Sequence, residues 1–188
     1  ALPDLDGQLV MHMSRSMYIS SFLIRKAFAA LDTTFQPSPT SLTDHIFQSP
    51  AFDDVQKPIV ELAIREYMAG SHVTAVHLLT PQIEQTVRNL LEKAGGSVLK
   101  PARQSGFDLK QLDELLRDPI IVQILGEDAT FYFRVLLTDR RGWNLRNNIC
   151  HGLCPADTIG STMSDRLLHV LLCLGMLREQ PSGPQPPQ

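Results

Sequence analysis

The stretch HVTAVHLLTPQIEQTVRNLLEKAGG, residues 72–96, decides the fold class. Its apolar residues recur at spacings of three and four, the period of an amphipathic helix. They are Val76, Leu79, Ile83, Val87, Leu90 and Leu91. Ser71 is a suitable N-cap and Gly95-Gly96 a suitable end, so we expect one helix over residues 72–94, bent or split by Pro81.

The same helical period extends towards the N-terminus. We expect a helix from Asp53 or Asp54 to Ala69, with Pro58 near its start and Gly70 at its end, and a short helix over residues 43–48. A first helix over residues 8–31 ends before a loop with two prolines, residues 36–41. This first helix is apolar on several sides, which favours a place in the core over an exposed partner surface.

Helices also dominate towards the C-terminus. A small hairpin is expected within residues 97–107, around a Lys-Pro-Ala-Arg-Gln-Ser turn. Helices are then expected over residues 108–117, 119–125, 127–141 and 161–178, the first with Asp108 as its cap. The sequence therefore predicts an all-α fold, a bundle of mostly antiparallel helices.

Composition narrows the class of protein. The 188 residues are 43% hydrophobic and 20% charged, with a formal net charge of −3, which argues against a broadly basic coat for long nucleic acids. Three cysteines without a secreted spacing pattern, and no signal peptide, favour the reducing cytoplasm. No apolar run reaches the roughly 20 residues of a membrane span.

Domain organisation follows from these elements. We expect an N-terminal helical extension over residues 1–50 that packs on a helical domain over residues 51–179. Residues 180–188 are rich in proline and polar residues, so we expect a disordered tail. The chain begins at Ala1 rather than at methionine, which is compatible with one domain of a longer protein.

The segment GWNLRNNICHGL, residues 142–153, carries the most chemistry. A guanidinium (Arg146) fits phosphate, and a histidine (His151) exchanges protons near neutral pH. RNA supplies its own nucleophile, the 2'-hydroxyl, so these groups are the minimal equipment for cleavage without a metal. Arginines outnumber acids four to one between Arg134 and His151, which makes a local anion site plausible.

Helical spacing places these side chains. In a helix that starts near Asn144, Asn147 and His151 share one face, and Leu145, Ile149 and Leu153 share another. His151 then points away from the core. Arg146 lies at the edge of the apolar face, where its charge needs an anionic partner.

The Arg-Asn-x-x-x-His pattern of Arg146, Asn147 and His151 resembles the RNxxxH signature of the HEPN superfamily (higher eukaryotes and prokaryotes nucleotide-binding domains). The wider setting, including residues 78–84, looks like a HEPN-related domain of uncharacterised function found in bacterial proteins and in a eukaryotic protein of endoplasmic-reticulum-associated RNA degradation. The resemblance spans roughly residues 72–178. It implies a HEPN-like helical bundle, and in many members a metal-independent endoribonuclease whose site is shared by two copies.

By this resemblance Arg146 and His151 are the candidate catalytic residues, with Asn147 as their polar companion. Four further residues are candidates for support or RNA binding: Glu84, Arg88, Arg141 and Asn144. Glu84 in particular is a candidate partner for the Arg146 guanidinium. Equally open for Glu84 and Arg88 is a simple ion pair one helical turn apart.

The sequence gives weaker support for two other functions of this segment, zinc binding and base stacking. Cys150, His151 and Cys154 lack the paired CxxC units of structural zinc sites, so neither a metal nor another cofactor is expected. Trp143 is interpreted as a loop anchor rather than a base-stacking residue.

The leading hypothesis is therefore an RNA-cleaving homodimer. The alternatives are a noncatalytic HEPN-like module that binds nucleotides or RNA, and a purely structural dimerisation domain of a larger protein.

Overall fold

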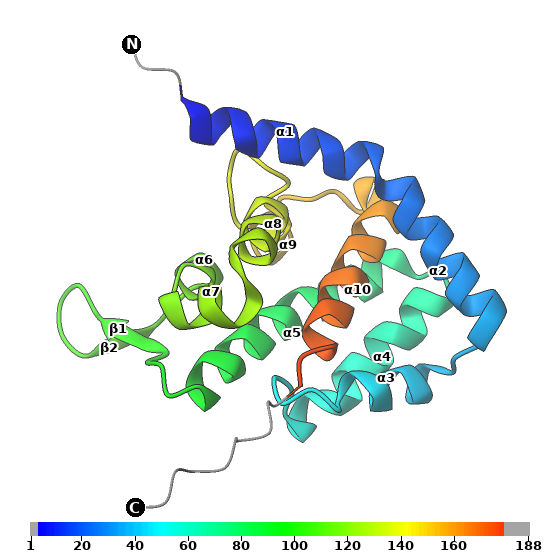
Figure 1. Ribbon diagram of the computed structural model, residues 1–188, viewed down its shortest axis with the longest axis horizontal. Helices are drawn as coiled ribbons and strands as arrows, with labels where there is room; N and C mark the ends of the chain where they lie inside the picture. The colour runs from blue at the N-terminus through cyan, green and yellow to red at the C-terminus, as the bar shows by residue number, and fades with distance from the viewer. Residues whose placement is uncertain (1–3, 179–188) are drawn as a thin grey trace, which may run out of the picture.

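Helix α5 (His72–Lys93) runs through the middle of the molecule and packs against α4 (Lys57–Met68), α9 (Leu145–Cys150) and α10 (Ser161–Gly175) (Figure 1). The computed structural model describes residues 4–178. Within that range the fold is all-α, apart from one short hairpin of two antiparallel strands. The predicted fold class is confirmed.

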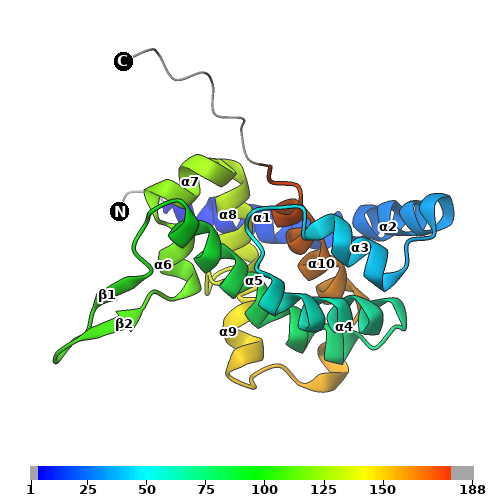
Figure 2. The ribbon, with the colours of Figure 1, turned by 90° about the horizontal axis from the view of Figure 1, so that it is seen from below.

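The remaining elements follow in chain order. They are α1 (Leu5–Ile19), α2 (Ser21–Phe35), α3 (Pro39–Ile46), the 3-10 turn η1 (Asp54–Gln56), β1 (Leu99–Pro101), β2 (Phe107–Leu109), α6 (Leu112–Leu116), α7 (Pro119–Leu125), α8 (Glu127–Leu137) and the 3-10 turn η2 (Ala156–Thr158). Figure 2 shows the β1–β2 hairpin projecting from one end of this helical body. The predicted hairpin is present, with Lys100 opposite Asp108.

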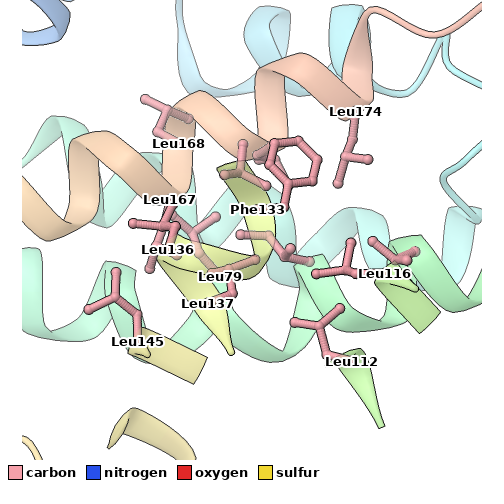
Figure 3. Close-up of a cluster of buried hydrophobic side chains, with 14 of the residues drawn as sticks. Leu79, Leu112, Leu116, Phe133, Leu136, Leu137, Leu145, Leu167, Leu168 and Leu174 are labelled. Atoms are coloured by element: carbon pink, nitrogen blue, oxygen red, sulfur yellow. The ribbon is translucent and has the colours of Figure 1, made fainter. Parts of the chain in front are cut away.

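The apolar stripe predicted for α5 forms part of the core. All six of its predicted apolar residues are buried. Pro81 does not split the helix, which is continuous through it. Figure 3 shows side chains from α5, α6, α8, α9 and α10 meeting in one cluster, including Leu79, Leu116, Phe133 and Leu145. Val10 and Ile46, which lie before residue 50, belong to the same cluster.

The predicted first helix over residues 8–31 is wrong in its continuity, because the chain forms two helices, α1 and α2, with a break at Ser20. The Ser20 hydroxyl donates to the Ser16 carbonyl at 2.6 Å, and the Ser21 hydroxyl donates to the Met17 carbonyl at 2.8 Å. The buried Arg166 of α10 also donates to the Met17 carbonyl and, at 2.9 Å, to the Ser20 hydroxyl. The Ser16 carbonyl still accepts from the Ser20 backbone N–H at 2.8 Å, whereas the Met17 carbonyl accepts from side chains, so the regular helix stops here.

Most of this segment lies outside the core, contrary to the prediction, and only Val10 and Met17 join the core cluster. Only Gly7, Val10 and Met17 of α1 are buried, and α2 has no fully buried residue. Several large apolar side chains of the two helices face solvent: Leu5, Leu9, Met11, Tyr18, Ile19, Phe22, Leu23 and Phe35. Figure 1 shows α1 and α2 along one edge of the molecule, where each packs on one side only.

Further helix boundaries differ from the predictions. The short helix predicted over residues 43–48 begins at Pro39, inside the predicted loop, because the Ser38 side chain caps it, and it ends at Ile46. Asp108 belongs to β2, and α6 begins later because Gln111 and Glu114 form a capping box. Helix α8 ends at Leu137 rather than at residue 141. The chain turns there because the Asp139 carboxylate accepts from the Arg141 backbone N–H at 3.0 Å. Helix α10 ends at Gly175, three residues before its predicted end.

Other predictions concern the ends of the chain and its relation to membranes. Within residues 4–178 no helix has the length and apolarity that a bilayer crossing requires. The predicted disordered tail, residues 180–188, lies outside the described residues. The division into an extension and a helical domain at residue 50 stays a prediction.

Candidate functional site around Arg146 and His151

The predicted Arg-Asn-x-x-x-His segment folds as α9, a helix of six residues between two left-handed turns. Asn144 precedes it at φ 52° and Gly152 follows its end at φ 67°. Leu145 and Ile149 are buried on its inner face. The predicted third member of this face, Leu153, is 68% exposed, because the helix ends at Cys150 and the chain turns outward.

Arg146 has the anionic partner that its position requires. Its Nε lies 2.7 Å from Glu84 Oε2, and its Nη2 lies 3.3 Å from Glu84 Oε1. The two side chains are 16% and 11% exposed, so this pair is shielded from bulk water. The ion pair proposed from the sequence is therefore present, and it joins α9 to the middle of α5.

Glu84 is shared between two guanidinium groups. Arg88, one turn further along α5, donates from Nη2 to Glu84 Oε1 at 2.9 Å and is 14% exposed. Two positive charges thus surround one carboxylate, and the cluster of Glu84, Arg88 and Arg146 keeps a net charge of about +1. The Arg88 Nε is buried without a hydrogen-bond partner among residues 4–178. The local surplus of positive charge suits an anion.

The two asparagines hold the start of α9 and orient Arg146. Asn147 Oδ1 accepts from Arg146 Nη1 at 3.1 Å, and Asn147 Nδ2 donates to Asn144 Oδ1 at 2.7 Å. Asn144 occupies the N-cap position, but its side chain does not cap the helix. Asn147 therefore acts on the guanidinium directly, and Asn144 acts on it through Asn147.

His151 is exposed and stands at the C-terminal end of α9, where its backbone N–H donates to the Asn147 carbonyl at 3.1 Å. Its imidazole makes no hydrogen bond within the described residues, so both ring nitrogens are free for proton transfer. This agrees with the predicted outward direction. Burial raises the pKa of the adjacent Cys150 thiol, while the nearby Arg146 charge opposes that rise.

Arg141 lies apart from this cluster. Its guanidinium binds Asp139 at 2.9 Å and Asp6 of α1 at 2.8 Å. Hydrogen bonds to these two carboxylates raise the pKa of Arg141, and the Arg141 guanidinium lowers the pKa of Asp139. Arg141 thus ties the loop before α9 to α1. The structure brings together Glu84, Arg88, Asn144, Arg146 and Asn147, with His151 at the far end of the same helix.

Trp143, which directly precedes Asn144, holds the loop before α9 against α1. The Trp143 indole N–H donates to the Ser14 carbonyl at 3.2 Å, and Arg166 lies 5.9 Å from its ring centroid, so Trp143 anchors α1 as expected. Four well-defined surface pockets within residues 4–178 have other lining residues than Arg146 and His151. The described residues contain no group of three or more potential metal ligands.

Sequence reasoning missed two polar clusters elsewhere. Arg166 has no carboxylate partner within residues 4–178 and is held by α1 and by aromatic rings. Asp165, next in the chain, binds Tyr67 and Arg25. The sequence signal for both clusters was the presence of Asp165 and Arg166 inside the apolar run of α10. Charged residues are rarely buried without a polar partner, so this position indicates partners elsewhere in the chain.

Comparisons of the chain with protein-family models, with curated proteins and with solved structures found no match.

Proposed function

We propose that the chain is a metal-independent endoribonuclease of the HEPN type. The observation that carries this proposal is the Glu84 carboxylate shared by Arg146 and Arg88, with His151 free on the same short helix as Arg146. Glu84 and Asn147 fix the direction of the Arg146 guanidinium, and Arg88 keeps the cluster positive. A preorganised cation and a free imidazole are two of the groups that RNA cleavage requires from a protein.

The proposed reaction uses the 2'-hydroxyl of RNA as the nucleophile. His151 takes the proton of this hydroxyl, and Arg146 stabilises the negative charge that develops on the pentavalent phosphate. The oxygen of the 5' leaving group departs with a proton from a second general acid. The products are a 2',3'-cyclic phosphate and a 5'-hydroxyl, and neither a metal nor another cofactor takes part.

We further propose that the active form is a homodimer in the cytoplasm. A single copy supplies one histidine, His151, to the proposed site, whereas the reaction needs both a general base and a general acid. A two-fold axis beside α9 places a second His151 opposite the first and forms a groove between them. The three cysteines are free, which suits a reducing compartment.

A chelator-controlled cleavage assay tests this proposal. Purified wild-type chain is incubated with single-stranded RNA in excess EDTA, and the product ends are identified by mass. His151→Ala and Arg146→Lys are expected to lower the cleavage rate at least 100-fold. The control His12→Ala, an exposed histidine of α1, is expected to leave the rate unchanged. A 2'-deoxy substitution at the cleaved position should abolish the reaction.

The second candidate is a noncatalytic module that binds RNA or nucleotides, or that assembles a larger protein. It is favoured by the 16% exposure of Arg146 and by the bonds that already engage each of its nitrogens. Wild-type chain that binds single-stranded RNA but never cleaves it, as monomer or dimer, would select this candidate and exclude the nuclease.

A further inference from the structure

Helix α2 covers a cavity of about 280 Å³ on the body formed by α3, α4 and α10. Its walls are mostly apolar: Phe28, Leu31, Leu42, Met68, Leu168 and Leu172. Sites for drug-sized ligands usually measure roughly 300 to 1,000 Å³, so this cavity suits a smaller molecule. Figure 1 shows α2 lying at the edge of the molecule, well away from α9.

The cavity exists because α2 does not pack completely. Since none of its residues is fully buried, the side chains on its inner face touch the body only in part. Apolar atoms that border a void lack the dispersion contacts of a filled core. An apolar guest would restore those contacts and would also bury wall surface that water now reaches.

One end of the cavity carries a positioned cation. Arg25 lines the cavity, and its Nε lies 2.9 Å from Oδ2 of Asp165, a side chain only 3% exposed. The Tyr67 hydroxyl donates to Asp165 Oδ1 at 2.6 Å. Burial raises the pKa of Tyr67, with the bond to Asp165 as the second cause, so its hydroxyl stays a donor. Asp165 thus anchors one edge of the guanidinium.

The other edge of that guanidinium is free. The Arg25 side chain is 44% exposed, and its two terminal nitrogens have no hydrogen-bond acceptor within residues 4–178. Two parallel N–H groups of a guanidinium match the two oxygens of a carboxylate. Asp32 also lines the cavity, seven residues further along α2, which is roughly 10 Å at the rise of a helix. Its negative charge repels a carboxylate from that end.

We propose that this cavity binds a small amphiphilic carboxylate. The apolar body of the ligand fills the space between α2 and α10, and its carboxylate lies on the free edge of Arg25, away from Asp32. The inference is independent of the proposed nuclease, because none of the lining residues belongs to the cluster around Arg146.

Calorimetric titration of the full chain with octanoate, octan-1-ol and octylamine tests this. Octanoate, used below its micellar range, is expected to bind about tenfold more tightly than octan-1-ol, the effect of one charge-assisted bond pair, and more tightly than octylamine. Ala29→Phe, which projects a ring from exposed α2 into the cavity, is expected to abolish binding of octanoate and octan-1-ol.

The role of the Arg25 charge is tested together with a change of Asp165, so that the variant does not contain a buried carboxylate without a partner. Arg25→Gln combined with Asp165→Asn is expected to make octanoate and octan-1-ol bind equally, whereas Arg103→Gln, at the hairpin tip, is expected to keep the tenfold difference. Failure of octanoate to bind wild-type chain, equal affinities for the three probes, or octanoate binding that survives Ala29→Phe would each overturn the proposal. Should the double variant not fold, the Ala29→Phe result and the comparison of octanoate with octylamine decide alone.

Discussion

The Glu84 carboxylate lies 2.7 Å from Arg146 Nε and, through its other oxygen, 2.9 Å from Arg88 Nη2. This contact links the central helix to the short helix that carries His151. Because Glu84 comes 62 residues before Arg146, the pair closes a long loop as well as neutralising a charge.

A double-mutant cycle on Glu84→Gln and Arg146→Lys is expected to give a coupling free energy of about 1 to 3 kcal/mol. Glu84→Gln leaves the buried Arg146 guanidinium without its carboxylate, and Arg146→Lys replaces a contact of two nitrogens with that of a single ammonium. Urea unfolding of the wild type, both single variants and the double variant measures it. Glu61→Gln, at the exposed pair with Arg65, should cost less than about 0.5 kcal/mol. If the changes in unfolding free energy caused by Glu84→Gln and Arg146→Lys are strictly additive, the contact between these two residues does not stabilise the fold.

Asn144→Ala is expected to be less stable than Asn144→Gly by about 1 kcal/mol. Both changes remove the hydrogen bond to Asn147, but only alanine is strained at the φ of 52° found here. Thermal unfolding of the two variants gives the difference. Equal stabilities would mean that residue 144 leaves the left-handed region in solution.

Arg166→Met is expected to destabilise the fold by about 1 to 3 kcal/mol, since the Met17 carbonyl and the Ser20 hydroxyl lose a charged donor. The effect should be local. Hydrogen exchange is expected to accelerate in α1 and α2 and to stay unchanged in α5. Arg65→Met, on exposed α4 surface, is the control. Uniform acceleration over the whole chain would exclude a role specific to this junction.

Stability is expected to fall as the pH drops from 7.5 to 5.5, and His169 is the reason. Burial, with the Arg166 charge as the second cause, lowers the pKa of His169 below its ordinary value of 6.5. The unfolded chain therefore binds this proton more readily than the folded chain, so the stabilisation is complete above pH 6.5 and is lost as the pH falls towards the folded pKa.

Urea unfolding at the two pH values measures the loss. His169→Gln is expected to reduce it, and His12→Gln, on the exposed face of α1, to leave it as in the wild type. A loss of the same size in wild type and His169→Gln would assign the pH dependence to other groups.

The sequence predicted the parts of this molecule that depend on local pattern. The period of α5 and the need of Arg146 for an acid both follow from neighbouring residues and elementary electrostatics. The outward direction of His151 followed from helical geometry alone.

Features that depend on distant residues escaped prediction. The break at Ser20 involves Arg166, which lies 146 residues away. The early end of α8 at Leu137 reflects a turn in which Asp139 and Arg141 bind each other instead of extending the helix. The exposed apolar side chains of α1 and α2 show that an all-round apolar helix can lie at an edge, because composition does not reveal how many neighbours a helix has.

The left-handed residues on both sides of α9 make the segment sensitive to length more than to composition. With Leu145 and Ile149 buried, α9 cannot slide along its axis. One residue inserted after Arg146 would rotate everything beyond it by roughly 100°, sending His151 to another side of the molecule. Relatives that share this chemistry should therefore preserve the number of residues between the arginine and the histidine, even where the identities of those residues differ.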